Sequence, residues 1–148
     1  MLDLEYKVLK VIFRSKKKKL KVGEISNQLH LPHSTIGSCV KRLEIDGHVI
    51  YERYKPFKLS KNGEDLAIEL IRHSRLLECL LINELGLDNK IAHKKSEKFN
   101  LLLSCETVNK ICEKYNYPTQ CPCGESILNS SNCRCEEEKN YNYFSSSN

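Results

Sequence analysis

Residues 22–63 constrain the fold more than any other part of the chain, because two short helical patterns are followed directly by a hairpin pattern. Ile25 and Leu29 lie four residues apart in the first helical pattern, so they share one face of a helix. The sequence His-Leu-Pro at residues 30–32 then predicts a sharp turn.

One more helix is predicted near the start of the chain by apolar residues at helical spacing, namely Leu4, Val8, Val11 and Ile12. The lysine run at residues 16–19 ends that helix and is expected to form a solvated loop.

The second helical pattern, at residues 33–47, has two different faces. Ile36, Val40 and Leu43 fall on one side of a helical wheel, and Gly47 is typical of the residue that ends a helix. The other side is polar, with His33, Ser34, Thr35, Ser38, Lys41 and Arg42. Such side chains suit a helix in the major groove of DNA, where hydroxyls reach base edges and cations neutralise phosphates. Taken alone, the segment also fits an ordinary amphipathic helix capped by Ser34.

Residues 48–59 predict a β-hairpin that would make this helix pair a winged helix. Two short strands at residues 48–53 and 57–59 would be joined by a turn at residues 54–56. Basic side chains near the tip are suited to contact a sugar–phosphate backbone, namely Arg53, Lys55 and Lys58. We therefore expect binding to double-stranded DNA, and the alternative is a winged helix that binds only proteins.

Charge is distributed unevenly along the 148 residues. Residues 1–63 contain 14 Lys and Arg against 6 Asp and Glu, a net charge of +8, whereas residues 64–148 contain 10 against 13, a net charge of −3. The basic first half agrees with phosphate contacts.

No apolar run approaches the ~20 residues that span a bilayer, and the start of the chain lacks the pattern of a signal peptide. We therefore expect a cytoplasmic protein with no membrane partner.

From about residue 8 to residue 127, the sequence resembles the family of iron- and manganese-dependent repressors typified by the diphtheria toxin repressor. The resemblance rests on the helix-turn-helix and wing, and then on LSKNGEDLAIEL, RLLECLLINELGLDNKIAH, LSCETVNKI and CPCGESI. It implies a homodimer that brings two recognition helices onto a palindromic operator. A long helix at residues 64–85 and the helices of residues 90–115 would form the dimerisation domain. The further C-terminal domain of the longer iron-dependent members is not expected here.

The leucines of the second half favour a dimer independently of the resemblance. They offer more apolar surface than so small a domain can bury alone. The residues concerned are Leu66, Leu70, Leu77, Leu80 and Leu81. The alternative is a monomer that packs these side chains internally.

The resemblance also implies a divalent-metal sensor, but other residues occupy most of its ligand positions. Lys7 and Lys10 stand where ligands are expected on the first helix, and an ammonium group repels a dication. Asn100 and Leu101 replace a Glu-His pair, and Ser74 stands at the position of a histidine. What is left is a weak residual site of Glu78, His93 and Glu97. The alternative is a solvated charged surface.

Two Cys-x-Cys pairs near the end of the chain are the best candidates for a replacement sensor. Nine residues separate the pairs, and they include several turn formers, so the chain could bring four thiolates to one point: Cys121, Cys123, Cys133 and Cys135. Four thiolates suit an iron–sulfur cluster or tetrahedral Zn²⁺. We favour the cluster, because a labile cluster could report iron or redox state. Redox-active thiols and chance clustering in a loose tail are the alternatives.

Together these patterns predict a mainly α protein with a small β-wing, in which a winged helix-turn-helix domain is followed by an all-α dimerisation domain. The expected order is 1–63 for the winged helix, 64–118 for the helical domain, 119–136 for a Cys-rich metal-binding segment and 137–148 for a disordered tail. The expected function is a dimeric DNA-binding repressor of genes for metal, iron or redox homeostasis. The alternative is a protein-interaction or metal-carrier protein with structural zinc. An enzyme is not expected, because no nucleophile with its base and no phosphate-binding glycine loop is evident.

Overall fold

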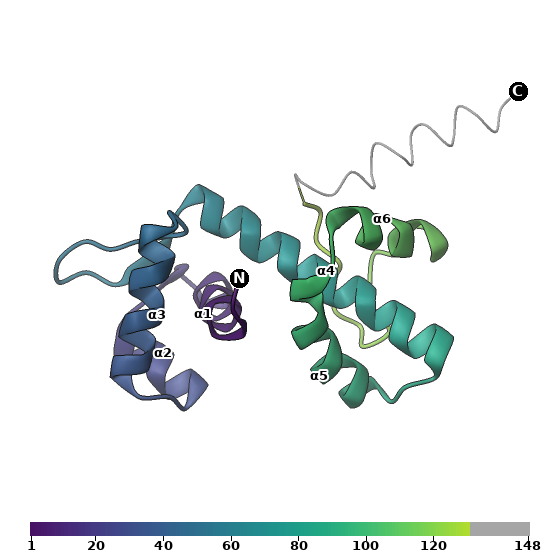
Figure 1. Cartoon of the computed structure of the whole chain (residues 1–148), viewed down its shortest axis with the longest axis horizontal. Coiled ribbons are helices and arrows are strands. Elements are labelled where there is room, and N and C mark those ends of the chain that lie inside the picture. Colours follow the sequence, from purple (N-terminus) through teal and green to yellow (C-terminus); the bar gives the residue numbers. More distant parts are fainter. Residues whose placement is uncertain (131–148) are drawn as a thin grey trace, which may run out of the picture. The chain divides into compact units, whose positions relative to one another are not determined.

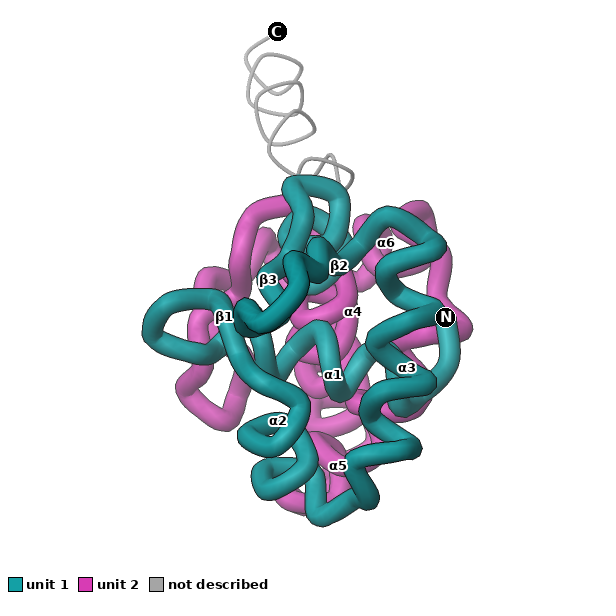
Figure 2. The backbone as a smooth tube through the Cα atoms, turned by 90° about the vertical axis from the view of Figure 1, so that its left-hand side faces the viewer, with its two compact units in different colours: residues 1–67 teal, residues 68–148 magenta. Residues whose placement is uncertain are grey.

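The computed structural model describes residues 1–130 (Figure 1). The chain forms two compact units, and the boundary between them lies after Ala67 (Figure 2). Helices make up most of both units, and the described strands form one small sheet in the first unit. The expected fold class is therefore confirmed: a winged helix-turn-helix followed by an all-α domain. None of the described helices is both long enough and apolar enough to cross a membrane.

Three helices lie wholly within the first unit: α1 (Asp3–Arg14), α2 (Val22–Leu29) and α3 (His33–Ile45). The predicted span of α2 is reproduced, and His30 makes the turn to α3 in the left-handed conformation, with a φ of 54°. Gly47 follows α3 with a φ of 77°, which suits glycine as the residue that ends a helix. The helices enclose an apolar core that includes Val8, Leu9, Ile12, Ile25, Ile36, Val40 and Leu43.

The sheet of this unit contains β1 (Lys19–Leu20), β2 (Val49–Ile50) and β3 (Phe57–Leu59), in the antiparallel order β1-β3-β2. The first wing strand is shorter than predicted, because pairing stops at Ile50 and residues 51–56 form the tip. The solvated loop expected at residues 16–19 is also only partly correct. Lys19 begins β1 and pairs with Lys58 of β3, so the third strand comes from a distant part of the sequence.

The second unit begins within α4 (Lys61–Leu85) and continues with α5 (Asn89–Phe99), the 3₁₀ helix η1 (Asn100–Leu102) and α6 (Cys105–Lys114). Asp88 caps α5 and Ser104 caps α6, each by accepting a backbone N–H with its side chain. Buried apolar residues of α4 and α6 form the core, with Leu76, Val108, Ile111 and Cys112 packed against Leu80, Tyr117 and Ile127.

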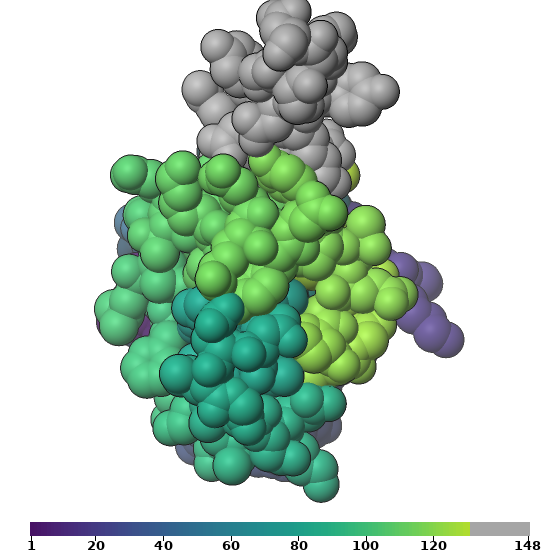
Figure 3. Space-filling view, turned by 90° about the vertical axis from the view of Figure 1, so that its right-hand side faces the viewer, coloured from purple at the N-terminus to yellow at the C-terminus, as the bar shows by residue number. Residues whose placement is uncertain are grey.

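After α6, the chain returns along α4, as the space-filling view shows for residues 119–130 in yellow-green (Figure 3). Two arginines of α4 hold this segment. Arg72 donates to the carbonyl oxygen of Leu128 at 2.9 Å, and Arg75 lies 3.1 Å from the carboxylate of Glu125. Gly124, with a φ of 87°, closes a tight turn by donating its N–H to the carbonyl of Cys121 at 2.8 Å. These contacts position two cysteines beside α4.

Candidate functional site

The polar face predicted for α3 is exposed. Ile36, Val40 and Leu43 are buried, whereas the opposite face presents His33, Ser34, Thr35, Ser38, Lys41 and Arg42 to solvent. Pro32, and not Ser34, occupies the N-cap position of α3. The hydroxyls on this helix are therefore not used for capping, and the face has the composition expected of a groove-reading helix.

Arg42 has a structural partner within the first unit. Its Nε atom lies 3.1 Å from Oε1 of Glu5, and the arginine side chain is 47% exposed. Burial acts to raise the pKa of Glu5, but the N–H of Leu2 and the Arg42 guanidinium outweigh it and hold that pKa below its usual value. Lys41 makes no such ion pair with the described residues, so it is the cation of α3 that is better placed to contact phosphate.

The wing combines positive charge with an exposed aromatic ring. Lys55 forms an ion pair with Glu52, and Nζ of Lys58 lies 3.8 Å from the same carboxylate. The hydrogen bond from Lys55 and the charges of both lysines lower the pKa of Glu52. Arg53 stacks over the ring of Tyr54, which is 86% exposed. The tip of the wing can therefore contact a sugar–phosphate backbone, although the Glu52 carboxylate offsets part of the positive charge of the two lysines.

In the second unit, Glu78 of α4 meets the thiols of Cys121 and Cys123, with the ligand atoms of all three within 4.8 Å of one another. Glu78 and Cys121 are buried, while Cys123 is exposed, and neither cysteine is in a disulfide. Nδ1 of His93, on α5, lies 2.7 Å from Oε1 of Glu78. One carboxylate, two thiols and a bordering imidazole thus converge on one place.

The hydrogen bonding of the Glu78 carboxylate indicates whether a metal ion fits this group of residues. Its Oε2 atom is buried and has no hydrogen-bond partner among the described residues. A buried polar atom without a partner costs about 1–3 kcal/mol, which a bound cation would offset. Oxygen, nitrogen and sulfur donors of these kinds are the ligands of Zn²⁺ and related divalent ions. The residues present therefore fit a divalent metal.

Both thiols hold their protons more tightly than an ordinary cysteine. Burial, and then the nearby Glu78 carboxylate, raise the pKa of Cys121 despite an opposing hydrogen bond from the backbone at Glu125. Although much of Cys123 is exposed, desolvation of its sulfur, and then its contact with the Glu78 carboxylate, raise its pKa to about 12. Since a thiol must lose its proton to bind a metal, binding here is coupled to pH.

The structure regroups the residues that the sequence singled out. Cys133 and Cys135 lie outside the described residues, so the four-cysteine cluster stays a prediction. His93 contacts Glu78 as the residual site requires, but Glu97 instead accepts a hydrogen bond from Ser74 at 3.0 Å and does not join the group. Sequence reasoning did not pair Glu78 with the cysteines. The sequence does contain a signal for this pairing. Glu78 is the one carboxylate within the largely apolar segment RLLECLL at residues 75–81, and a buried charge needs a partner.

Residues at the lost ligand positions have structural contacts instead. Lys7 forms an ion pair with Asp3 at 2.7 Å, and Nζ of Lys10 lies 5.6 Å from the centre of the Tyr6 ring. The buried amide of Asn100 donates to the carbonyl oxygen of Leu70 at 2.9 Å. Each of these three side chains therefore contacts a residue of its own unit.

Comparison with known proteins extends over both units. Residues 60–129 match the family model described as iron dependent repressor, metal binding and dimerisation domain. Over 93 residues the chain is 28% identical to the HTH-type transcriptional regulator MntR of Lysinibacillus sphaericus, a match that covers 63% of this chain and 66% of that protein. It is also 28% identical over 105 residues to the iron-dependent repressor IdeR of Mycobacterium bovis, covering 71% of this chain and 46% of that protein. The match thus spans from about half to about two thirds of these relatives.

Solved structures also match the chain over most of its length. The hypothetical protein SSo2273 from Sulfolobus solfataricus matches with a TM-score of 0.76 and 27% identity, over 87% of this chain and all of that one. The manganese regulator SloR matches with a TM-score of 0.75 and 26% identity, over 84% of this chain and 59% of that one.

Proposed function

Because the chain belongs to the family of iron- and manganese-dependent transcriptional repressors, we propose that it is a cytoplasmic, homodimeric repressor whose binding to DNA is controlled by a divalent metal ion. The members of this family are regulators and not enzymes. One observation carries the proposal. The Glu78 carboxylate, whose buried Oε2 atom lacks a hydrogen-bond partner among the described residues, lies beside the thiols of Cys121 and Cys123.

Glu78, Cys121 and Cys123 would hold the metal, and His93 borders them. When bound, the ion supplies positive charge that replaces the two thiol protons and satisfies the carboxylate. Two sulfur donors favour Zn²⁺ and Fe²⁺ over Mn²⁺. An iron–sulfur cluster would take thiolate ligands, whereas a carboxylate joins the two cysteines in the described residues. We therefore propose that this site binds a single divalent ion. The genes regulated by the metal-bound protein would serve metal homeostasis.

The first unit would bind DNA through α3 in the major groove and through the wing on the backbone. Two copies would present two α3 helices to a palindromic operator. Large apolar side chains left uncovered on the second unit support an association surface there. Ile91 and Phe99 are each 48% exposed, and Leu102 is 82% exposed.

Fluorescence anisotropy with DNA from upstream of the chain's own gene tests the proposal. Under anaerobic conditions, Zn²⁺ or Fe²⁺ should tighten binding by about 5- to 150-fold relative to the chelated protein, the usual range of coupling between two sites. Equal affinity with metal and with chelator would exclude metal control. Metal binding without any DNA binding would favour the protein-interaction or metal-carrier alternative.

The same assay separates the DNA contacts from general charge. Lys41→Ala removes an exposed cation of α3 and should lower the slope of log affinity against log salt by about 1. Lys110→Ala makes the same change of charge on α6, where we propose no DNA contact, and should leave the slope unaltered. Equal losses in both variants would place the DNA contact elsewhere.

Metal affinity should rise with pH, because the pKa values of both thiols lie above that of an ordinary cysteine. Each proton displaced adds up to about tenfold in affinity per pH unit below the thiol pKa, so two protons give a limit of about 100-fold. Competition titrations with a chromophoric chelator at several pH values would measure this slope. Cys121→Ser with Cys123→Ser should abolish metal binding at this site, whereas binding with an unchanged slope in that variant would place the metal at other ligands.

A further inference from the structure

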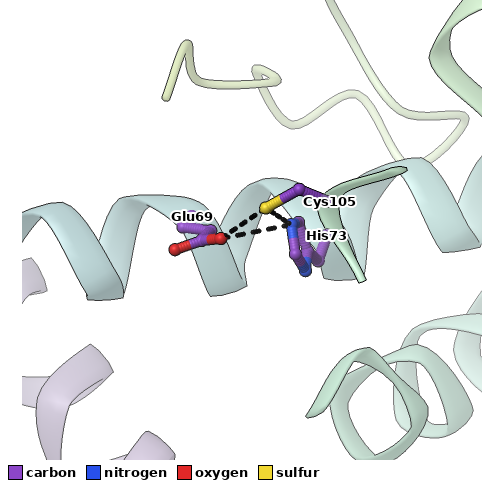
Figure 4. Close-up of side chains that lie close together, drawn as sticks. All are labelled: Glu69, His73 and Cys105. Carbon is purple, nitrogen blue, oxygen red and sulfur yellow. Dashed lines mark hydrogen bonds and ion pairs between the residues drawn. The ribbon is translucent and has the colours of Figure 1, made fainter. Parts of the chain in front are cut away.

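Three other potential ligands meet in the second unit, away from the site described above. Glu69 and His73 lie one helical turn apart on α4, and Cys105 is the first residue of α6. Figure 4 shows the three side chains directed toward one another from these two helices. Their ligand atoms all lie within 4.8 Å of one another. Carboxylate, imidazole and thiol groups therefore converge between two helices of one unit.

The separations resemble the edges of a tetrahedral metal site. Nε2 of His73 lies 3.7 Å from Sγ of Cys105 and 3.9 Å from Oε1 of Glu69. Zn²⁺ with ligand bonds of about 2.0–2.3 Å requires such atoms to be about 3.4–3.6 Å apart. The third edge is shorter, because the thiol of Cys105 donates a hydrogen bond to Oε1 of Glu69 at 2.6 Å. Only this edge has to lengthen markedly when a metal replaces the thiol proton.

The burial and charge of the three groups suit a bound dication. Burial lowers the pKa of His73, with partial opposition from the Glu69 carboxylate. Cys105 is the first residue of α6, and its thiol proton points to the Glu69 carboxylate, so a bound metal ion would take the place of that proton. The side chain of His73 is only 3% exposed and that of Glu69 is 14% exposed. The carboxylate and thiolate charges together would balance a dication.

This group is separate from the Glu78 site. Glu78 follows His73 by five residues, which is about 140° around a helix. The two sets of ligands therefore start from different faces of α4. Arg72, which opposes positive charge at His73, directs its guanidinium to the Leu128 carbonyl and to Sγ of Cys112, 3.3 Å away.

We propose that Glu69, His73 and Cys105 form a second metal site, which binds a Zn²⁺-like divalent ion and joins α4 to α6. Binding forms one bond each from sulfur, nitrogen and oxygen to the ion, and the Cys105 proton leaves to solvent. A water molecule would complete the four ligands. The site is independent of the proposed control of DNA binding, so either proposal can fail alone.

Cobalt, which gives a thiolate charge-transfer band, is a direct probe. The starting variant is the full chain with Cys121→Ser, Cys123→Ser, Cys133→Ser and Cys135→Ser, hereafter the four-serine variant. It should bind one Co²⁺ per chain and show this band. Adding Cys105→Ser should abolish the band, whereas adding Cys112→Ser, two turns further along α6, should preserve it. Adding Glu69→Gln should weaken Co²⁺ binding at least tenfold without loss of helical circular dichroism.

Absence of the band in the folded four-serine variant, or its survival after Cys105→Ser, would overturn the proposal. If the four-serine variant does not fold, the unmodified chain still provides a test. It should bind one more Co²⁺ than its Cys105→Ser variant, and equal stoichiometry would refute the site. Cys105→Ser in the otherwise unmodified chain should also retain metal-dependent DNA binding, which distinguishes this site from the one at Glu78.

Discussion

Replacing Glu78 with glutamine is expected to weaken Zn²⁺ binding at the site of Cys121 and Cys123 by more than about 100-fold, since loss of residues that merely support a ligand already costs about 10- to 100-fold. The amide keeps the volume of the side chain but removes the buried negative charge beside Cys121 and Cys123. DNA binding should then become insensitive to metal. Competition titration measures the first effect and anisotropy the second, with circular dichroism of the metal-free protein as the check on folding.

Glu97→Gln is the matched control, because it makes the same change on α5 at a carboxylate that accepts a hydrogen bond from Ser74. It should reduce metal affinity by less than about tenfold. A loss as large as that in Glu78→Gln would instead indicate that the residual set of Glu78, His93 and Glu97 holds the ion.

The largest effect on stability is expected for Gly63→Ala at the start of α4. A Cβ atom at this position would lie 1.9 Å from the backbone oxygen of His48. That oxygen already accepts the N–H of Ser60 at 3.0 Å, and the Ser60 hydroxyl accepts the N–H of Gly63 at 3.0 Å. The wing and α4 cannot separate without losing these bonds. We expect the first unit to lose about 3 kcal/mol or more of unfolding free energy.

Gly37→Ala provides the contrast within the same unit. Gly37 lies inside α3, and a Cβ atom there would meet nothing within 4 Å. It should stabilise the unit by about 0.5–1 kcal/mol, because alanine favours the helix. Thermal and urea unfolding followed by circular dichroism would measure both variants. Similar unfolding curves for Gly63→Ala and the unmodified chain would show that the backbone can yield at this point.

Local patterns predicted the helices well and the sheet less well. The span of α2 and the two faces of α3 follow from apolar spacing, which each helix carries within its own sequence. The strand β1 could not be predicted in this way. Lys19 and Leu20 are a strand only because β3, nearly forty residues later, provides the hydrogen-bonding partner.

The candidate metal site shows the same limit. Cys121 and Cys123 stand out by their spacing, but their pairing with Glu78 depends on how residues 119–129 return along α4. Arg72 and Arg75 set that path through backbone carbonyls, and such contacts leave no periodic pattern in the sequence. Distant elements that meet through side-chain contacts with backbone therefore require the structure.

The ion pair between Arg42 and Glu5 bears on how the winged helix would respond to salt. DNA releases condensed counterions only when a protein cation takes their place at a phosphate. Arg42, Lys55 and Lys7 each already face a carboxylate within the unit. The formal charge of +8 on residues 1–63 therefore overstates the number of counterions that binding can release. Discrimination by α3 would rest more on its hydroxyls, whose contacts with bases change little with ionic strength.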